Sequence, residues 1–267
     1  MEITVFPDDQ ALADALASEI VEGIEISLGN GQTYVLGCPG GRTPTLTLKA
    51  LVERLGRAGL DLSRVTLAMM DEYAIADGSS FRVVSRDLHF SVRRYIDEHF
   101  LSPLNAVLSP DDAAPFSEEQ IWFPDPARPL DYDARLADAG GVDLFILASG
   151  ASDGHIAFNP PGTPRAQRSA VFTLADTTKV DNLATFPDFG GVEEVPSFGV
   201  SVGVATIAEV SKRAVMVATG ADKRRAVSTL AASDAYDPAW PATIVTECRN
   251  AAIYVDAVAS GAEASVE

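Results

Sequence analysis

The chain has 267 residues, of which 47% are hydrophobic and 22% charged, a composition typical of a globular protein with a sizeable core. Its formal net charge of −18 speaks against a nucleic-acid or anionic-membrane partner, because either partner needs clustered Lys and Arg. No apolar run approaches the roughly 20 residues of a membrane helix, and no basic-then-apolar leader begins the chain. The two cysteines, Cys38 and Cys248, fit no metal spacing. We therefore expect a cytoplasmic protein with reduced thiols.

Strand-like and helix-like segments alternate along the chain. Apolar residues at helical spacing predict helices, the first with Asp8 or Asp9 as its N-cap, and short apolar runs predict strands. This alternation predicts an α/β fold: a doubly wound, mostly parallel sheet with helices on both faces, in a Rossmann-like three-layer sandwich. No repeat or linker divides residues 1–267, so we expect a single domain. In chain order we expect a helix over 9–22, a strand over 33–37, a helix over 45–58, a strand over 65–70, a helix over 85–100, strands over 143–148 and 214–219, a helix over 222–232 and a strand over 252–256.

The segments that follow the strands are the candidates for a site, because ligands of such sheets bind beyond the carboxyl ends of the strands. The first predicted strand leads into a glycine turn in which Gly40 and Gly41 let the backbone approach a ligand. Arg42, Thr43 and the free N–H groups of the next helix add donors suited to phosphate. The segment has neither Walker nor dinucleotide-binding spacing, and a plain strand-to-helix turn is the alternative.

Two adjacent acids, Asp71 and Glu72, follow the second predicted strand. Neighbouring residues that leave a strand point to opposite sides, so we expect only one carboxylate to face the crevice. Partial desolvation there would raise its pKa and suit it to act as a base. An acidic helix cap or a solvated loop is the alternative interpretation.

The turn Asp153-Gly154-His155 follows the third predicted strand, and Lys223 follows the fourth. Such a turn can present an imidazole that gives and takes protons near neutral pH, together with a carboxylate. Lys223 lies in the first turn of a predicted helix, from which it could reach a phosphate; a solvated basic face is the alternative.

The segments after the strands contain four motifs, which are Pro39-Gly-Gly-Arg-Thr-Pro44, Met70-Asp-Glu-Tyr73, Asp153-Gly-His-Ile-Ala-Phe-Asn159 and Gly220-Ala-Asp-Lys223. In their order and spacing they resemble the glucosamine-6-phosphate deaminase family, which shares a superfamily with 6-phosphogluconolactonase, and the resemblance covers roughly residues 10 to 256. The Asp-Glu-Tyr and Asp-Gly-His-Ile-Ala-Phe-Asn motifs resemble the deaminase branch, whereas the lactonase branch usually has Asp-Glu-Arg and a Thr-Ala-Ser continuation.

The resemblance implies an enzyme that isomerises or deaminates a phosphorylated sugar without cofactor or metal. The histidine, oriented by the acid two residues before it, would help to open the pyranose ring. A carboxylate would then move a proton between C2 and C1 through an enediol-like intermediate, and in a deaminase ammonia leaves C2 to give fructose 6-phosphate. The expected site comprises Asp71, Asp153 and His155 as catalytic residues, Gly40, Gly41, Arg42, Thr43 and Lys223 as phosphate-binding residues, and Glu72 and Asn159 in support.

The sequence departs from the family's pattern at four places, one of which is the stretch Ala148-Ser149-Gly150-Ala151-Ser152, where the family prefers a Gly-x-Gly turn. The family follows Phe-Asn with Glu-Pro, and that glutamate assists the histidine, whereas Pro160 here offers neither proton nor charge. The phosphate-binding arginine of the family's Asn-x-Arg-Phe-Phe motif is missing from residues 182–186, and the basic residues of the allosteric pocket have no counterpart after Arg168.

These departures keep three functions open. The motifs favour a deaminating or isomerising enzyme on a phosphorylated sugar. The missing glutamate favours a sugar-lactone hydrolase in which His155 is the base for water. A non-catalytic sugar-phosphate-binding module is the third. The small-molecule partner is a sugar phosphate in each case, and the oligomeric state, a homo-oligomer included, stays open.

Overall fold

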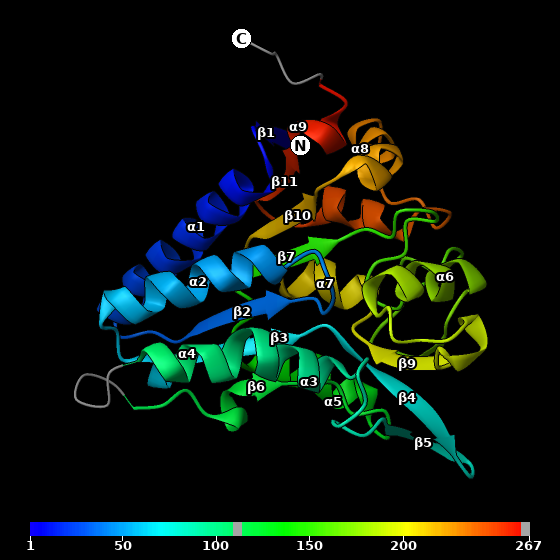
Figure 1. The fold of residues 1–267 in the computed structure, drawn as a ribbon, viewed down its shortest axis with the longest axis horizontal. Helices are drawn as coiled ribbons and strands as arrows, with labels where there is room; N and C mark the ends of the chain where they lie inside the picture. The colour runs from blue at the N-terminus through cyan, green and yellow to red at the C-terminus, as the bar shows by residue number, and fades with distance from the viewer. Residues whose placement is uncertain (109–113, 263–267) are drawn as a thin grey trace.

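The computed structural model describes residues 1–108 and 114–262 (Figure 1). A seven-stranded sheet in the order β1-β11-β10-β7-β2-β3-β6 forms its centre, and all its strand pairs are parallel. The predicted α/β class is therefore confirmed. The strands of this sheet are β1 (Glu2–Phe6), β2 (Tyr34–Cys38), β3 (Val65–Met69), β6 (Ile121–Trp122), β7 (Leu144–Ala148), β10 (Ala214–Ala218) and β11 (Ala251–Asp256).

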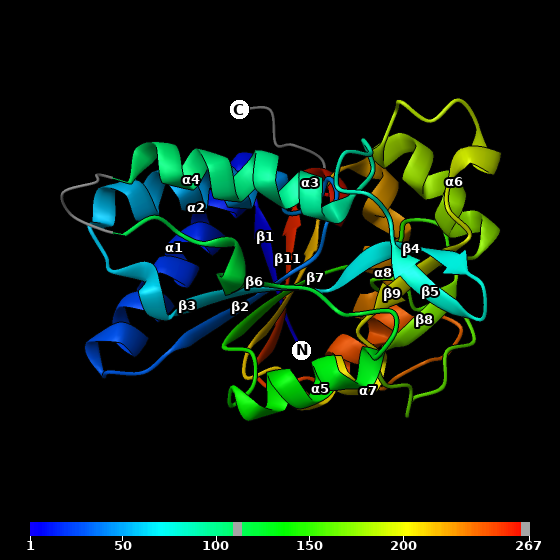
Figure 2. The same cartoon turned by 90° about the horizontal axis from the view of Figure 1, so that it is seen from below.

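Helices cover both faces of the sheet (Figure 2). The helices α1, α2, α3 and α4 lie on one face, and α5 and α7 lie on the other. None of the described helices is both long and apolar enough to cross a membrane. Their bounds are α1 (Asp9–Gly29), α2 (Thr45–Ala58), α3 (Val92–Ile96), α4 (Ser102–Val107), α5 (Pro129–Asp138), α6 (Asp176–Thr185), α7 (Val204–Val210), α8 (Arg224–Ala231) and α9 (Ala257–Ser260), with a short π-helix over Asp97–Leu101 between α3 and α4.

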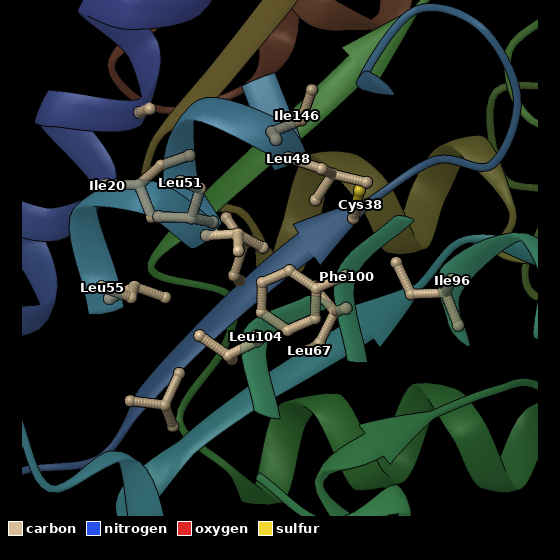
Figure 3. Close-up of a cluster of buried hydrophobic side chains, with 14 of the residues drawn as sticks. Ile20, Cys38, Leu48, Leu51, Leu55, Leu67, Ile96, Phe100, Leu104 and Ile146 are labelled. Atoms are coloured by element: carbon tan, nitrogen blue, oxygen red, sulfur yellow. The ribbon is translucent and has the colours of Figure 1, made fainter. Parts of the chain in front are cut away.

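The alternation of side chains along each strand supplies a hydrophobic core to both faces. Leu36 of β2 packs into the core under α1 and α2, whereas its neighbour Val35 packs into the core on the opposite face. Figure 3 shows Leu48 and Leu51 of α2 in the first core, facing Phe100 of the π-helix. Strands buried on both faces read as continuous apolar runs, which is why the sequence predicts them well.

The predicted helix over 85–100 is wrong in its first half. Residues 85–90 form turns, and α3 begins at Val92 with Ser91 as its N-cap. The reason is tertiary, because the buried carboxylate of Glu72 accepts the backbone N–H groups of Val92 and Arg93 at 3.0 and 2.9 Å and fixes the helix start there.

A second, antiparallel sheet in the order β5-β4-β9-β8 lies beside the main sheet and was missed in the sequence. Its strand β4 continues β3 after Met70, so Asp71 begins a strand instead of a loop. An aromatic cluster that includes Tyr73 and Phe158 packs against this sheet. The strands are β4 (Asp71–Asp77), β5 (Ser80–Val83), β8 (Ala170–Thr173) and β9 (Phe198–Ser201).

The order of the main sheet creates a crevice between β2 and β7. These strands are neighbours, but the chain continues from β2 outward to β3 on one side and from β7 outward to β10 on the other. The loops that leave β2 and β7 therefore diverge to opposite sides, and the gap between them is where open α/β sheets bind ligands.

Candidate active site

A cavity of about 370 Å³ opens at this crevice. Its walls are built by the segments that follow β2, β3, β7 and β10, together with α6 and Phe158. The catalytic candidates Asp71 and His155 and all five phosphate-binding candidates line it; these five are Gly40, Gly41, Arg42, Thr43 and Lys223.

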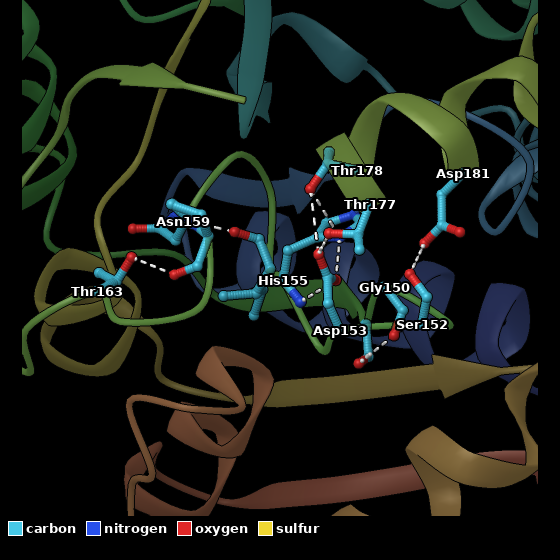
Figure 4. Close-up of polar contacts among 12 residues, drawn as sticks. Gly150, Ser152, Asp153, His155, Asn159, Thr163, Thr177, Thr178 and Asp181 are labelled. Atoms are coloured by element: carbon cyan, nitrogen blue, oxygen red, sulfur yellow. Dashed lines mark hydrogen bonds and ion pairs between the residues drawn. The ribbon is translucent and has the colours of Figure 1, made fainter. Parts of the chain in front are cut away.

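Asp153 and His155 form a hydrogen-bonded pair at the cavity wall (Figure 4). Oδ1 of Asp153 lies 2.7 Å from Nδ1 of His155 and also accepts its backbone N–H at 3.0 Å. Thr177 and Thr178 of α6 donate to Oδ2. Burial opposes ionisation of Asp153, but the hydrogen bonds from His155 and Thr177 outweigh it and hold the pKa of this carboxyl well below its usual range.

The geometry of the pair suits proton transfer with a ligand. Since Nδ1 of His155 is held by a carboxylate, Nε2 is the ring nitrogen left to exchange protons with a bound molecule. Gly150 makes room for the pair, because a Cβ on this residue would lie 2.2 Å from Nδ1. Any side chain at position 150 would therefore displace the imidazole.

Asp71 and Glu72 point to opposite sides of β4, as predicted. Asp71 is buried and lines the cavity, where burial and the neighbouring charge of Glu72 raise its pKa to about 7. No donor in the described parts of the chain bonds its carboxylate. Glu72 lies outside the cavity and accepts hydrogen bonds from Ser91 Oγ and from the backbone of Tyr73, Val92 and Arg93.

The cavity wall also carries cationic side chains. Arg42 pairs with Asp222 at 3.7 Å, but both side chains are more than half exposed, so this contact stabilises little. Nζ of Lys223 donates to the carbonyl oxygen of Ser149 at 2.8 Å, and burial lowers the pKa of this ammonium. Together with the N–H groups of the turn at Gly41, they could bind a phosphate.

Asn159 does not line the cavity but ties two segments together. Its Nδ2 donates to the carbonyl oxygens of Ile156 and Val202 at 2.9 and 2.7 Å. The turn that it closes contains Ala157, whose φ of 49° is a strained conformation for alanine, and Ala157 lines the cavity. Asn159 therefore supports the shape of the site without touching a ligand.

Helix α6 contributes residues that the sequence analysis missed. Asp181 and Asn182 line the cavity, while Thr177 and Thr178 hold Asp153. The sequence analysis compared residues 182–186 with the family's Asn-x-Arg-Phe-Phe motif, but no motif marks the rest of this helix, and its covering role follows only from its packing over the crevice.

One group of side chains in the described parts of the chain has the spacing of a metal site. Ligand atoms of Asp153, His155 and Asp181 lie within 4.8 Å of one another. Both oxygens of Asp153 already accept hydrogen bonds, and the charge of Lys223 is close enough to interact with Asp153 and Asp181. Since a metal ion needs several free ligand atoms, this donor set fits a metal ion poorly.

Comparisons with a family model and with known sequences both find glucosamine-6-phosphate isomerases or deaminases. The family model described as "Glucosamine-6-phosphate isomerases/6-phosphogluconolactonase" matches residues 7–254. The glucosamine-6-phosphate deaminase of Rhodococcus opacus is 33% identical over 264 residues, which cover 97% of this chain and 92% of the relative. That of Streptomyces avermitilis is 33% identical over 231 residues, covering 85% and 80%.

Two solved structures share the fold. A monomeric glucosamine-6-phosphate deaminase superposes with a TM-score of 0.81 at 24% identity, over 98% of this chain and 100% of that one. The 6-phosphogluconolactonase of Trypanosoma brucei superposes with a TM-score of 0.66 at 20% identity, over 97% of both chains. At these identities the two similarities concern the fold alone.

Proposed function

Because the chain belongs to the family of glucosamine-6-phosphate isomerases and 6-phosphogluconolactonases, we propose that it is a glucosamine-6-phosphate deaminase, which converts this amino sugar to fructose 6-phosphate and ammonia. The observation that carries the proposal is Asp71, a buried carboxyl with a pKa of about 7. It lines the same cavity as His155, which is hydrogen-bonded to Asp153. A group that titrates near neutrality can both remove a proton from carbon and return it.

Ring opening is the first step. His155 takes the proton of the C1 hydroxyl and delivers a proton to the ring oxygen, which breaks the C1–O5 bond and leaves an aldehyde at C1. Asp153 holds the imidazole through Nδ1 and stabilises its charged form while the proton is in transit. The chemistry therefore needs the hydrogen-bonded pair that the turn provides.

Proton transfer between carbons is the second step. The Asp71 carboxylate removes the proton from C2, which the adjacent aldehyde acidifies, and the resulting enolamine is protonated at C1. The product is a ketimine at C2, and water hydrolyses it to the ketone and ammonia. Asp71 begins and ends this sequence in the same protonation state, and no net oxidation occurs.

Phosphate binding supplies the orientation. Arg42, Lys223 and the glycine turn would hold the phosphate at one end of the cavity and so place C1 and C2 near the acid–base groups. Glu72 and Asn159 support the site from outside, by fixing the start of α3 and the turn at Ala157. We extend the proposal to a single domain and a cytoplasmic location, supported by Cys38 and Cys248, which are buried and free.

Lactone hydrolysis is the second candidate function, and Pro160 is the observation that favours it. In a lactonase His155 would activate water, and no base for a carbon-bound proton would be required. The two functions thus differ in what they require of Asp71.

A substrate deuterated at C2 tests the proposal. We expect the wild-type protein to release ammonia and fructose 6-phosphate in equal amounts and to move the deuterium from C2 to C1 or to water. Asp71→Asn should abolish both while leaving the binding of inorganic phosphate intact. Turnover in the variant at the wild-type rate would contradict the role of Asp71.

A further inference from the structure

Asp181 is a charged residue of the cavity wall to which the steps above give no role. It is half-buried on α6 and directs its carboxylate toward the segment after β7 (Figure 4). Ser152 Oγ donates to its Oδ2 at 3.1 Å, whereas no donor within residues 1–108 and 114–262 bonds Oδ1. One oxygen is therefore held in place and the other can accept a hydrogen bond from a ligand.

The position of Asp181 is next to the acid–base pair. One of its oxygens, a ring nitrogen of His155 and an oxygen of Asp153 lie within 4.8 Å of one another. The imidazole that a ligand would contact thus lies beside Asp181. In the proposed reaction His155 contacts the oxygen on C1, and the substituent of C2 is attached to the neighbouring carbon.

When a phosphate is bound, the charges of the cavity favour an ammonium group of the ligand beside Asp181. The cationic side chains of the wall, Arg42 and Lys223, are the proposed partners of the phosphate. Asp222 already pairs with Arg42. The charge of Lys223 also interacts with Asp181. A phosphate dianion bound to Lys223 would compete for this charge and leave the carboxylate of Asp181 less well balanced. An ammonium group on the ligand would restore the balance and make a charge-assisted hydrogen bond.

We propose that Asp181 is a specificity-determining residue that recognises the ammonium group on C2 of an amino-sugar phosphate and discriminates against a hydroxyl at this carbon. The inference rests on the proposed function for the placement of C2, but it concerns binding and not turnover. A hydrogen bond between charged partners changes affinity by about 10-fold to 100-fold. Because Asp181 is only half-buried, we expect the lower end of this range.

Two probes that cannot react separate this role from catalysis. One is glucosamine 6-phosphate reduced at C1 to the amino alditol phosphate, and the other is the same alditol phosphate with a hydroxyl in place of the amine. Calorimetry on the whole protein should show that wild type binds the amino probe about 10-fold more tightly. Asp181→Asn should reduce that preference to about 2-fold or less, and Asp181→Glu should retain part of it.

Asp176→Asn is the matched control, since it removes the same charge from the same helix at a fully exposed position, where Asp176 is paired with Lys179 at 3.8 Å. Its preference should equal that of wild type. An unchanged preference in Asp181→Asn would overturn the inference. An equal gain in affinity for both probes would also overturn it, because it would show only that the Asp181 carboxylate repels the phosphate that both probes carry. If wild type prefers the amino probe but releases no ammonia, the proposed function fails and the role of Asp181 stands.

Discussion

Asp71→Asn should remove the activity and at the same time stabilise the folded protein above neutral pH. The rise of the Asp71 pKa from 3.8 to about 7 means that the folded protein holds this proton more tightly than the unfolded chain does. Stability is therefore lost as the pH rises from about 4 to about 7, and the loss is complete above that range. Asparagine cannot ionise, so the variant avoids the loss.

The size of the effect follows from the same change in pKa. At about 1.4 kcal/mol per pH unit, ionising the buried carboxyl costs the folded state roughly 4 kcal/mol. Water entry and small movements of the chain reduce such costs, so we expect the variant to gain roughly 2 to 4 kcal/mol at pH 8 and almost nothing at pH 4. Burial of Asp71 is the first cause of this cost and the charge of Glu72 the second.

Urea unfolding of wild type and variant at both pH values measures this difference. Asp176→Asn, on the exposed surface of α6, controls for the loss of one negative charge and should change the free energy of unfolding by the same small amount at both pH values. A loss of stability in Asp71→Asn that is equal at pH 4 and pH 8 would refute the reasoning. It would show that ionising Asp71 costs the folded protein no free energy.

Three further substitutions address the rest of the site. His155→Gln should slow turnover of the ring-closed sugar far more than that of an open-chain analogue; equal losses on both would argue against ring opening. Lys223→Ala should raise KM about 10-fold or more with kcat changed much less, because it removes a phosphate contact, and an unaltered KM would refute that contact. Gly150→Ala should lower kcat about 100-fold by displacing the imidazole of His155. Gly29→Ala should leave kcat unchanged, because a Cβ there meets nothing within 4 Å. A fully active Gly150→Ala protein would contradict the tight packing of Gly150 against His155.

Five of the seven strands of the main sheet and much of the site were predictable from the sequence, because both depend on local patterns, whereas the strands β1 and β6 were missed. The helix predicted over 45–58 has the observed bounds, and the strand predicted over 143–148 is one residue longer than β7. Glycines and charged residues directly after such strands necessarily gather at one edge of a parallel sheet, which places Arg42, Asp71 and Lys223 around one cavity.

The parts that were missed depend on contacts between distant segments. Strands β5 and β8 carry no continuous buried run, since β5 alternates between exposed and half-buried positions and only Phe172 of β8 is buried, so no strong pattern marks them. The start of α3 depends on Glu72, 20 positions before Val92. Asp181 comes to the cavity only because α6 packs over the crevice, and no spacing in the sequence indicates that position.

The measurement that tests the account most directly is turnover of glucosamine 6-phosphate, with ammonia and fructose 6-phosphate followed together and hydrolysis of 6-phosphogluconolactone assayed beside it. The account predicts equal release of ammonia and ketose and little lactone hydrolysis, which would show that Pro160 is compatible with deamination. Lactone hydrolysis without ammonia would contradict it and assign His155 to the activation of water.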